Sequence, residues 1–322
     1  MSTLVLTRSD TVSLLDTASI VPALRDAFIA YSMTPGARAR RVRAGISDKS
    51  PGTTTVLFPG TTPAIPAFTV KIHAKFPRQD PAIRGVLCLH DLTTGALLAI
   101  MESSYLTAVR TGISGALAAH VLSAPGSSDV AIIGAGVQGR QQLRCLASLR
   151  RLRRVRVYDI VAAKSEAYAD TLISELGLCI EVASSVEHAV EAADIILTAT
   201  WARAPFLRSG MLKAGAHVTT LGADEPGKAE VSADVLRSAL FVCDDRKLAI
   251  EMGALGAVGL GSEEIAAELG EVLNGSHPGR TDPRQITVFG GVGLAFQDAV
   301  TAWAIYQEAL RCSVGEEVDF LA

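Results

Sequence analysis

A glycine-rich loop with the spacing of a phosphate-binding turn occurs at Gly134-Ala135-Gly136-Val137-Gln138-Gly139. It follows the apolar run 130–133, so the pattern is that of a strand ending in a turn that opens a helix. Glycine lets the backbone turn tightly and approach a pyrophosphate, and the free N–H groups of the helix start attract the anion. The sequence therefore predicts that Gly134 and Gly136 bind a dinucleotide.

The next expected strand ends in Val157-Tyr158-Asp159, about 20 residues beyond the loop. A carboxylate there can accept hydrogen bonds from the adenosine ribose, although a helix N-cap is the alternative interpretation. Asp159 would repel a 2′-phosphate, and residues 160–162 offer no arginine to receive one. NAD is therefore favoured over NADP, which stays possible.

Three charged residues stand in otherwise apolar surroundings. Lys71 lies in the strand-like run 68–72, where it is either buried and paired or on a solvent face of an edge strand. Arg110 can hold a carboxylate by two hydrogen bonds or form a structural ion pair. Asp224 follows an apolar strand and can act in acid/base chemistry, or it is an ordinary turn residue before Pro-Gly. These residues are the predicted anchoring and reacting groups.

The elements around these residues form a mixed α/β part followed by an alternating part. Residues 14–31 and 103–122 have helical spacing. Four β-rich runs, split by Pro and Gly turns, lie between them at 53–58, 67–72, 85–91 and 97–102. A linker at 123–128 then precedes expected strands at 130–133, 155–158, 180–182, 195–198, 217–221 and 240–243, and helices at 137–149, 162–176 and 186–192. Such alternation predicts a doubly wound parallel sheet, and the tail 292–312 is again helical.

Composition restricts the function classes. With 322 residues, 49% of them hydrophobic and 20% charged, the chain can build two globular domains. A formal net charge of −3 supplies no positive field for nucleic acid, which is therefore not an expected partner. No apolar stretch reaches membrane-spanning length and no signal segment is evident, so no membrane association is expected.

The cysteines and histidines show no ligand pattern. Five cysteines are scattered without CxxC spacing, which indicates thiols in a reducing, cytoplasmic compartment and no zinc site. No metal-ligand cluster, P-loop or Ser-His-Asp order is present, and the six histidines are isolated, with only His73 near Lys71. Of two arginine runs, 38–43 can face a small anion, whereas 150–154 is expected to be a solvated surface.

Several motifs occur in one order along almost the whole chain. They are Lys71 in its strand, Tyr105-Leu106-Thr107-Ala108-Val109-Arg110-Thr111-Gly112, the loop 134–139 with Gln138, Gly222-Ala223-Asp224-Glu225-Pro226-Gly227-Lys228, and Phe289 followed by Val292-Gly293-Leu294-Ala295-Phe296-Gln297-Asp298. Through these motifs the chain resembles the ornithine cyclodeaminase/mu-crystallin family, which also contains archaeal-type alanine dehydrogenases and ketimine reductases.

The resemblance implies an α/β architecture in which a Rossmann domain is inserted into a smaller mixed α/β substrate and dimerisation domain. The Rossmann domain would cover residues 123–296, and the other domain residues 1–122 completed by 297–322. A homodimer is also implied.

The resemblance further implies individual roles. Arg41, Lys71 and Arg110 would surround the carboxylate of a small 2-amino or 2-imino acid, orienting it for hydride transfer. Asp224, with Lys71 as the other catalytic group, would act at the reacting amino or imino centre. The expected cofactor contacts are Thr111, Gly134, Gly136, Val137, Gln138, Asp159, Thr198 and Lys228. No metal is implied.

Two departures from the family pattern bear on the substrate. Gly290-Gly291 stand where members often carry Asp-Ser, and Val56 stands three residues before Pro59, where cyclodeaminases tend to have Glu. Loss of a carboxylate that would receive an amino group argues against a diamino acid. We therefore expect an NAD(P)-dependent oxidoreductase of the alanine dehydrogenase or ketimine (pyrroline-2-carboxylate) reductase type.

Two alternatives stay open. One is ornithine cyclodeaminase, an ammonia lyase that uses NAD+ catalytically to form proline and would release ammonia without net NADH. The other is a mu-crystallin-like binding protein that keeps the cofactor domain without turnover, against which the intact set of Lys71, Arg110 and Asp224 speaks.

Overall fold

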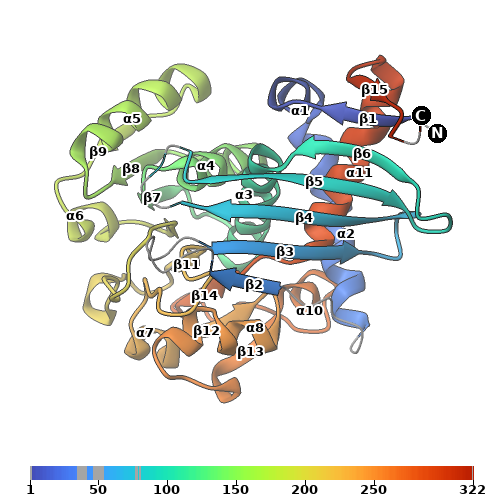
Figure 1. The fold of residues 1–322 in the computed structure, drawn as a ribbon. Coiled ribbons are helices and arrows are strands. Elements are labelled where there is room, and N and C mark those ends of the chain that lie inside the picture. Colours follow the sequence, from blue (N-terminus) through green and yellow to red (C-terminus); the bar gives the residue numbers. More distant parts are fainter. Residues whose placement is uncertain (1, 35–41, 46–53, 77–78, 80, 321) are drawn as a thin grey trace. The chain divides into compact units, whose positions relative to one another are not determined.

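The computed structural model describes the chain except residues 1, 35–41, 46–53, 77–78, 80 and 321 (Figure 1). The chain forms two compact units, Met1–Arg110 with Leu294–Ala322, and Thr111–Gly293. The first boundary falls inside helix α3 (Ser103–Leu122), and the second lies just before helix α11 (Ala295–Cys312). The boundaries predicted from the sequence, at 122 and 297, lie at the end of α3 and in the first turn of α11.

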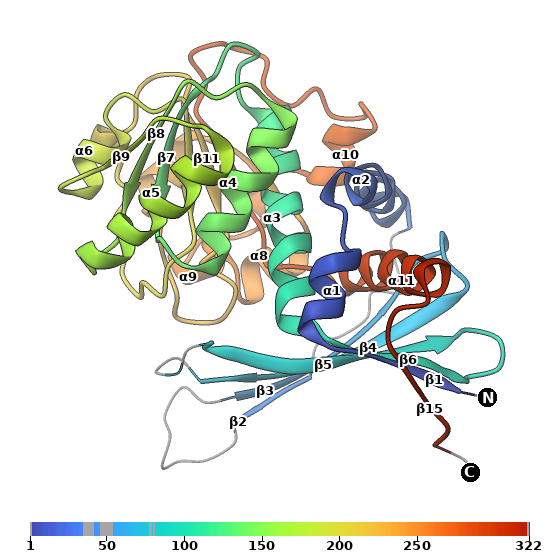
Figure 2. The same ribbon diagram turned by 90° about the horizontal axis from the view of Figure 1, so that it is seen from above.

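The first unit is built on a mixed seven-stranded sheet. In spatial order its strands are β15 (Glu316–Val318), β1 (Thr3–Leu6), β6 (Leu97–Glu102), β5 (Ile83–Asp91), β4 (Ala67–Lys75), β3 (Thr54–Thr61) and β2 (Val42–Gly45). Strands β1 and β6 are parallel, and the other neighbours are antiparallel. Helices α1 (Arg8–Leu14), α2 (Thr17–Met33) and α11 lie on the same side of this sheet (Figure 2).

Helix α11 packs closely on β3, β4 and β5. Its inward residues include Ala299 and Ala302, which are fully buried and too small to hold the helix away from the sheet. At Gly60 a Cβ would lie only 2.3 Å from the carbonyl oxygen of Ala295, so the first turn of α11 crosses β3 at a position that requires glycine.

Strand β4 has an unusual buried face. Side chains alternate between the two faces of a strand, and on β4 the face that carries Thr69, Lys71, His73 and Lys75 is the buried one. A covered sheet face is normally apolar, and buried charged groups persist when they are paired. Lys71 is therefore not a solvent-face lysine of an edge strand, because β4 lies between β3 and β5.

The second unit is a doubly wound domain, which confirms the predicted fold class. Its eight parallel strands have the order β13 (Ile265–Glu268), β12 (Leu240–Cys243), β14 (Thr287–Gly290), β11 (His217–Thr220), β10 (Ile195–Thr198), β7 (Asp129–Ile133), β8 (Arg154–Tyr158) and β9 (Ile180–Val182). Strand order reverses at β7 and β10, and ligands of such sheets bind at the carboxyl ends of the strands beside this point.

Helices flank this sheet. The longer ones are α4 (Val137–Leu149) and α5 (Ala162–Leu176), and the short ones are α6 (Val186–Val190), α7 (Ala233–Ser238), α8 (Arg246–Glu251), α9 (Ala254–Ala257), α10 (Leu269–Leu273) and the 3-10 turns η1 (Ser209–Met211) and η2 (Ser262–Glu264). Among the described residues, no helix is both long and apolar enough to cross a membrane.

Most expected elements occur within a few residues of their predicted bounds. The helix expected at 14–31 is α2, which starts after Leu14, the last residue of α1, because the side chain of Asp16 accepts hydrogen bonds from the backbone of Ala18 and Ser19 and caps it. The final helix starts at Ala295 and not at Val292, since the preceding segment runs out of β14, a central strand that the sequence did not predict.

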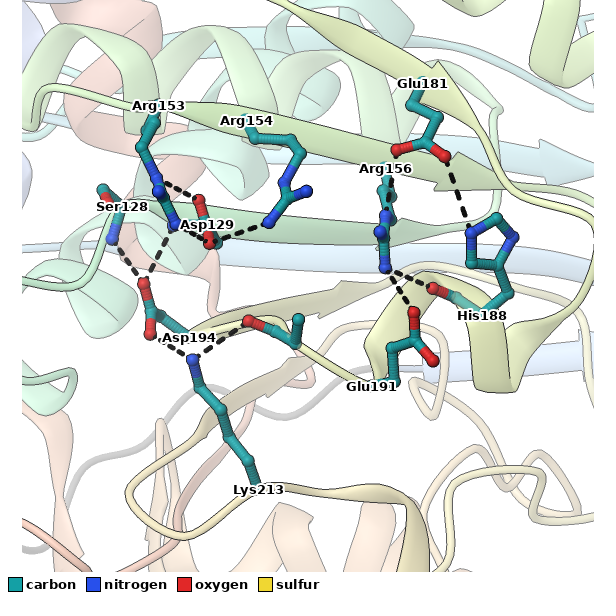
Figure 3. A network of polar contacts seen from close by, with 11 residues as sticks. Ser128, Asp129, Arg153, Arg154, Arg156, Glu181, His188, Glu191, Asp194 and Lys213 are labelled. Atoms are coloured by element: carbon teal, nitrogen blue, oxygen red, sulfur yellow. Dashed lines mark hydrogen bonds and ion pairs between the residues drawn. The ribbon is translucent and has the colours of Figure 1, made fainter.

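Ion pairs join the amino-terminal ends of β7, β8 and β9 (Figure 3). Arg153 and Arg154 both pair with Asp129, the first residue of β7. Arg156 of β8 pairs with Glu181 of β9, with an Nε to Oε2 distance of 3.0 Å. These pairs are exposed or partly exposed to water, so each adds little to stability.

The run 150–154 is therefore more than the solvated surface expected from its charge. Besides the pairs of Arg153 and Arg154, Arg150 donates from Nη2 to the carbonyl oxygens of Ala124 and Pro125, both at 3.0 Å. The guanidinium thus fixes the linker that leads into β7. Asp194 accepts from the backbone N–H of Ser128 at 2.8 Å and strengthens the same connection (Figure 3).

Candidate active site

The glycine loop has the conformation that its sequence predicts. Gly134 has a φ of 105°, and a Cβ at this position would lie 2.6 Å from the carbonyl oxygen of Ala199. A Cβ at Gly139 would lie 2.1 Å from the carbonyl oxygen of Gly134, because helix α4 starts directly against the end of β7. Both positions therefore need glycine for the fold itself.

Gly136 differs from the other two loop glycines. It is the N-cap of α4 with a φ of −78°, which any residue can adopt, and a Cβ built there meets no atom within 4 Å. The space that this Cβ would fill lies at a helix N-terminus, where a pyrophosphate is favoured. The loop therefore fits a dinucleotide, and Gly136 is the residue whose missing side chain serves the ligand.

We predict that Gly136→Ala folds like the wild type but weakens NADH binding by about tenfold or more, because the new methyl group occupies the approach to the pyrophosphate. Isothermal titration with NADH and thermal unfolding check the two halves of this prediction. Gly139→Ala is the matched control: it should lower the melting temperature, because its methyl group collides with backbone. Unchanged NADH affinity of Gly136→Ala would contradict the assignment.

Three further predicted cofactor residues lie in this loop or next to it. Asp159 is partly exposed and accepts hydrogen bonds from the N–H of Ala135 at 2.9 Å and of Val161 at 3.0 Å. It is not the N-cap of α5, which is Val161. Val137 is 54% exposed at the first turn of α4. Within the described part of the chain, the buried Oε1 atom of Gln138 has no hydrogen-bond partner, so it can accept a bond from a ligand.

Thr198, at the carboxyl end of β10, is fully buried and belongs to a network that the sequence did not reveal. Its hydroxyl donates to Glu230 at 2.7 Å, and Glu230 also accepts from the hydroxyls of Thr200 and Thr220 at 2.7 Å each. The N–H groups of Thr200 and Gly222 donate to the same carboxylate at 2.6 and 2.9 Å. Glu230 thus joins the ends of β10 and β11, and the side chain of Thr198 is used within the protein.

Asp224 and Lys228 form a pair just beyond this network. Lys228 Nζ lies 2.8 Å from Asp224 Oδ1 and 3.8 Å from Glu225 Oε1. The same ammonium lies 3.9 Å from the ring centroid of Trp201, a cation–π contact that accounts for a lysine side chain only 5% exposed. The Asp224 side chain is 28% exposed, so it has a fixed partner and also access to solvent. A carboxylate in this setting can exchange protons.

The first unit contains a buried cluster of opposite charges. Lys71 Nζ from β4 lies 2.6 Å from Asp298 Oδ2, and Arg110 Nε from α3 lies 2.9 Å from Asp298 Oδ1. The exposed fraction of the side chain is 5% for Lys71, 6% for Arg110 and 0% for Asp298. Arg110 therefore forms the structural ion pair that was one of its two interpretations from the sequence, and its binding of a substrate carboxylate stays a prediction.

The charges around Asp298 keep it ionised. Its burial alone would raise the pKa, but the nearby charges of Arg110 and Lys71 outweigh this effect, and the pKa is lowered below its ordinary value. Lys71 also donates to the hydroxyl of Thr107 at 3.4 Å and lies 5.2 Å from the ring centroid of Phe58.

Gln297 completes this cluster. Its Oε1 atom accepts a hydrogen bond from Arg110 Nη1 at 2.6 Å and another from the N–H of Leu294 at 3.3 Å. The second bond is the return bond of a helix N-terminus, in which the third residue caps the N-cap residue. Gln297 is fully buried, so α11 brings both an amide and a carboxylate to the two cations.

Two buried histidines have structural environments. His73 Nε2 lies 2.8 Å from the hydroxyl of Ser103, and burial together with the charge of Lys71 lowers the pKa of His73 to about 2. His217 is held between Thr287 and Thr219, and burial lowers its pKa to about 3. Both rings are therefore neutral near pH 7 and add no charge to their surroundings.

The predicted residues thus form separate groups. Lys71 and Arg110 come together in the first unit, whereas Asp224 pairs with Lys228 in the second. Arg41 lies outside the described residues. Thr111 lies half-buried in α3, in the second unit.

Sequence reasoning missed the partners Asp298, Gln297 and Glu230. Asp298 and Gln297 stand in one of the quoted motifs but received no role, and Glu230 follows two residues after Lys228 in an otherwise apolar run. The available signal for Asp298 was an acidic residue near the start of a helical apolar pattern.

Comparison with known proteins agrees with these features. The model of the ornithine cyclodeaminase/mu-crystallin family matches residues 1–313. An alanine dehydrogenase from Archaeoglobus fulgidus is 31% identical over 338 residues, covering 99% of each chain.

Two solved structures are similar over the full length. Thermococcus litoralis Delta(1)-pyrroline-2-carboxylate reductase, in complex with NADH and L-proline, has a TM-score of 0.92 and 30% identity, covering 98% of this chain and 100% of that one. An archaeal alanine dehydrogenase dimer with bound NAD has a TM-score of 0.91 and 28% identity, covering 100% of both chains.

Proposed function

The chain belongs to the ornithine cyclodeaminase/mu-crystallin family and is an NAD(P)-dependent oxidoreductase of amino and imino acids; within this class, we propose that it interconverts a small 2-imino acid and its 2-amino acid. The observation that carries this proposal is the buried cluster of Lys71 and Arg110, which is suited to one carboxylate. Its cofactor is NAD(H), which supplies or accepts the hydride when bound.

In this proposal Lys71 and Arg110 bind the substrate carboxylate, together with Arg41. Two cations already oriented by Asp298 lose little conformational freedom when an anion arrives. Arg110 is suited to planar recognition of a carboxylate, and Lys71 adds a compact charge. The acid is thereby held by the end of the molecule that does not react.

Asp224 is the proposed proton donor and acceptor. Reduction of an imine places a proton on nitrogen, and oxidation of the amine removes one, so a carboxylate with solvent access can serve both directions. Lys228 holds this carboxylate at 2.8 Å and is its positioning partner. Gly134, Gly136, Val137, Gln138 and Asp159 bind the dinucleotide in this proposal, and Thr111 and Thr198 support that site.

Val56 supports an oxidoreductase over the cyclodeaminase alternative. This residue is buried on β3, directly opposite His73 of β4, and it lies on the face of the sheet that also carries Lys71. A diamino acid would place a second ammonium group that requires a carboxylate partner, and an isopropyl side chain cannot provide one. The proposed substrate therefore has one carboxylate and no second amino group.

The test is NADH oxidation by the purified protein with pyruvate plus ammonia, pyrroline-2-carboxylate and piperideine-2-carboxylate. Ammonia release from ornithine is measured in parallel. NADH loss with an imino or keto acid is the expected result. Ornithine-dependent ammonia without net NADH oxidation would instead identify a cyclodeaminase, and NADH binding without any turnover would identify a binding protein.

A homodimer is also proposed, and the uncovered face of the first unit's sheet supports it. Val42, Leu57, Ile72 and Val86 lie side by side across β2, β3, β4 and β5 and are 38–57% exposed. An exposed apolar row on the side away from the helices suits association with a second copy of the chain. A cytoplasmic location stays a proposal from the sequence.

We predict that Ile72→Glu converts the dimer into a monomer, because association would bury a charge from each copy in an apolar contact. Analytical ultracentrifugation measures the mass directly. Leu310→Glu is the matched control, since Leu310 is 53% exposed on α11, on the opposite side of the sheet. A dimer that survives Ile72→Glu would exclude this face as the interface.

A further inference from the structure

Gln297 carries a buried hydrogen-bond donor that nothing in the described part of the chain uses. Its Nε2 atom has no partner there, although the side chain is fully buried. The orientation of the amide is settled by Oε1, which accepts from Arg110 Nη1 at 2.6 Å and from the N–H of Leu294 at 3.3 Å. A flipped amide would set its NH₂ group against two donors, so Nε2 is the unpartnered atom.

An unpartnered buried donor is uncommon, because desolvation of the N–H group is not compensated. The oxygen of this amide contacts Arg110, whose guanidinium also binds Asp298. Asp298 itself is held between Arg110 and Lys71, which leaves the amide of Gln297 at the edge of a cationic cluster. A group that satisfied Nε2 there would be an acceptor, and the two cations favour an anionic one.

We propose that Gln297 is a substrate-binding residue whose amide N–H donates to a carboxylate oxygen of the substrate, beside Lys71 and Arg110. This inference rests on the proposed function only in taking a 2-imino or 2-amino acid as the anion. Gln297 then has two tasks with two atoms: Oε1 orients Arg110 and caps α11, and Nε2 recognises the ligand. Recognition by a neutral donor adds directionality that the two charges alone lack.

The substitution Gln297→Glu tests the role of Nε2 separately from the role of Oε1. Glutamate keeps an oxygen that can accept from Arg110 and Leu294, but it replaces the donor by a second acceptor that carries negative charge. We expect KM for pyrroline-2-carboxylate to rise by about 10- to 100-fold, the loss of a hydrogen bond to a charged group. The affinity for NADH, measured by titration, should stay unchanged. This result would show that the variant is folded.

Thr301→Val is the matched control. The Thr301 hydroxyl is likewise buried without a partner among the described residues, and it lies one helical turn further along α11. Its removal should leave KM unchanged. A comparable rise in KM for Thr301→Val, or a change of less than about twofold for Gln297→Glu, would overturn the proposal.

A ligand that cannot be reduced distinguishes this inference from the proposed function. Pyrrole-2-carboxylate is a planar carboxylate, and its binding in the presence of NAD+ can be measured by calorimetry. Binding to the wild type but not to Gln297→Glu would support the donor role even if no imino acid were turned over. Equal binding to both proteins would refute it even if the wild type proved to be an active reductase.

Discussion

Replacement of Asp224 by asparagine is expected to lower kcat for imino-acid reduction by about 10²- to 10⁴-fold, the usual contribution of a positioned proton-transfer group. Asparagine preserves the size of the side chain and an oxygen for the bond to Lys228, which is 2.8 Å long in the wild type, but it cannot exchange a proton. Stopped-flow or steady-state measurement of NADH oxidation at saturating substrate gives kcat. NADH affinity should be retained, because Asp224 does not belong to the glycine loop.

Glu225→Gln provides the matched control for Asp224→Asn. Glu225 is a buried neighbour whose Oε1 atom lies 3.8 Å from the same lysine ammonium. Its replacement removes a negative charge near Lys228 but no proposed proton-transfer group, so kcat should fall by less than about tenfold. Equal losses in the two variants would mean that local charge, and not proton transfer by Asp224, is what the reaction needs.

Replacement of Asp298 by asparagine should destabilise the first unit by about 3–5 kcal/mol, because two buried cations lose their common partner. Lys71 and Arg110 are only 5% and 6% exposed, so water cannot replace the carboxylate. Thermal unfolding should show a decrease of about 10 °C or more. The double variant Lys71→Met/Asp298→Asn should lose less than the sum of the single losses, since one unpaired cation has been removed.

The effect of Asp298→Asn should also depend on pH in a defined direction. The pKa of Asp298 is lowered in the folded protein, so its stabilising contribution is present above the ordinary value of 3.8 and is lost as the pH falls through the folded value. The difference in stability between wild type and variant should therefore stay constant above about pH 5 and shrink below pH 4. A difference that grows on acidification would show that Asp298 is protonated in the fold.

The dinucleotide half of the protein was predictable because its signals are local. A strand, a glycine turn and a helix lie within residues 129–149, and Gly139 is required by the carbonyl oxygen of Gly134, only five residues away. Strand β14 shows the limit of such reasoning. The identity of Thr287–Gly290 as a strand depends on β11 and β12, which flank it.

The charge cluster was predictable only in part. Lys71 and Arg110 drew attention because charged residues stand out in apolar runs, but their common partner lies 227 residues beyond Lys71. No periodicity links positions that far apart, since the contact forms only after α11 has packed on β4. The capped start of α11 explains why Gln297 can be both buried and polar, and the pairs with Lys71 and Arg110 explain the same for Asp298.

The polar buried face of β4 has a consequence for engineering. Well-packed apolar residues in place of a buried ion pair are often neutral or stabilising by about 1–4 kcal/mol. A screen for thermal tolerance alone would therefore favour apolar substitutions at Lys71, Arg110 and Asp298, and under the proposed function the most stable variants would be inactive. Selections for a more robust catalyst should leave these three positions unchanged and diversify the rest of the chain.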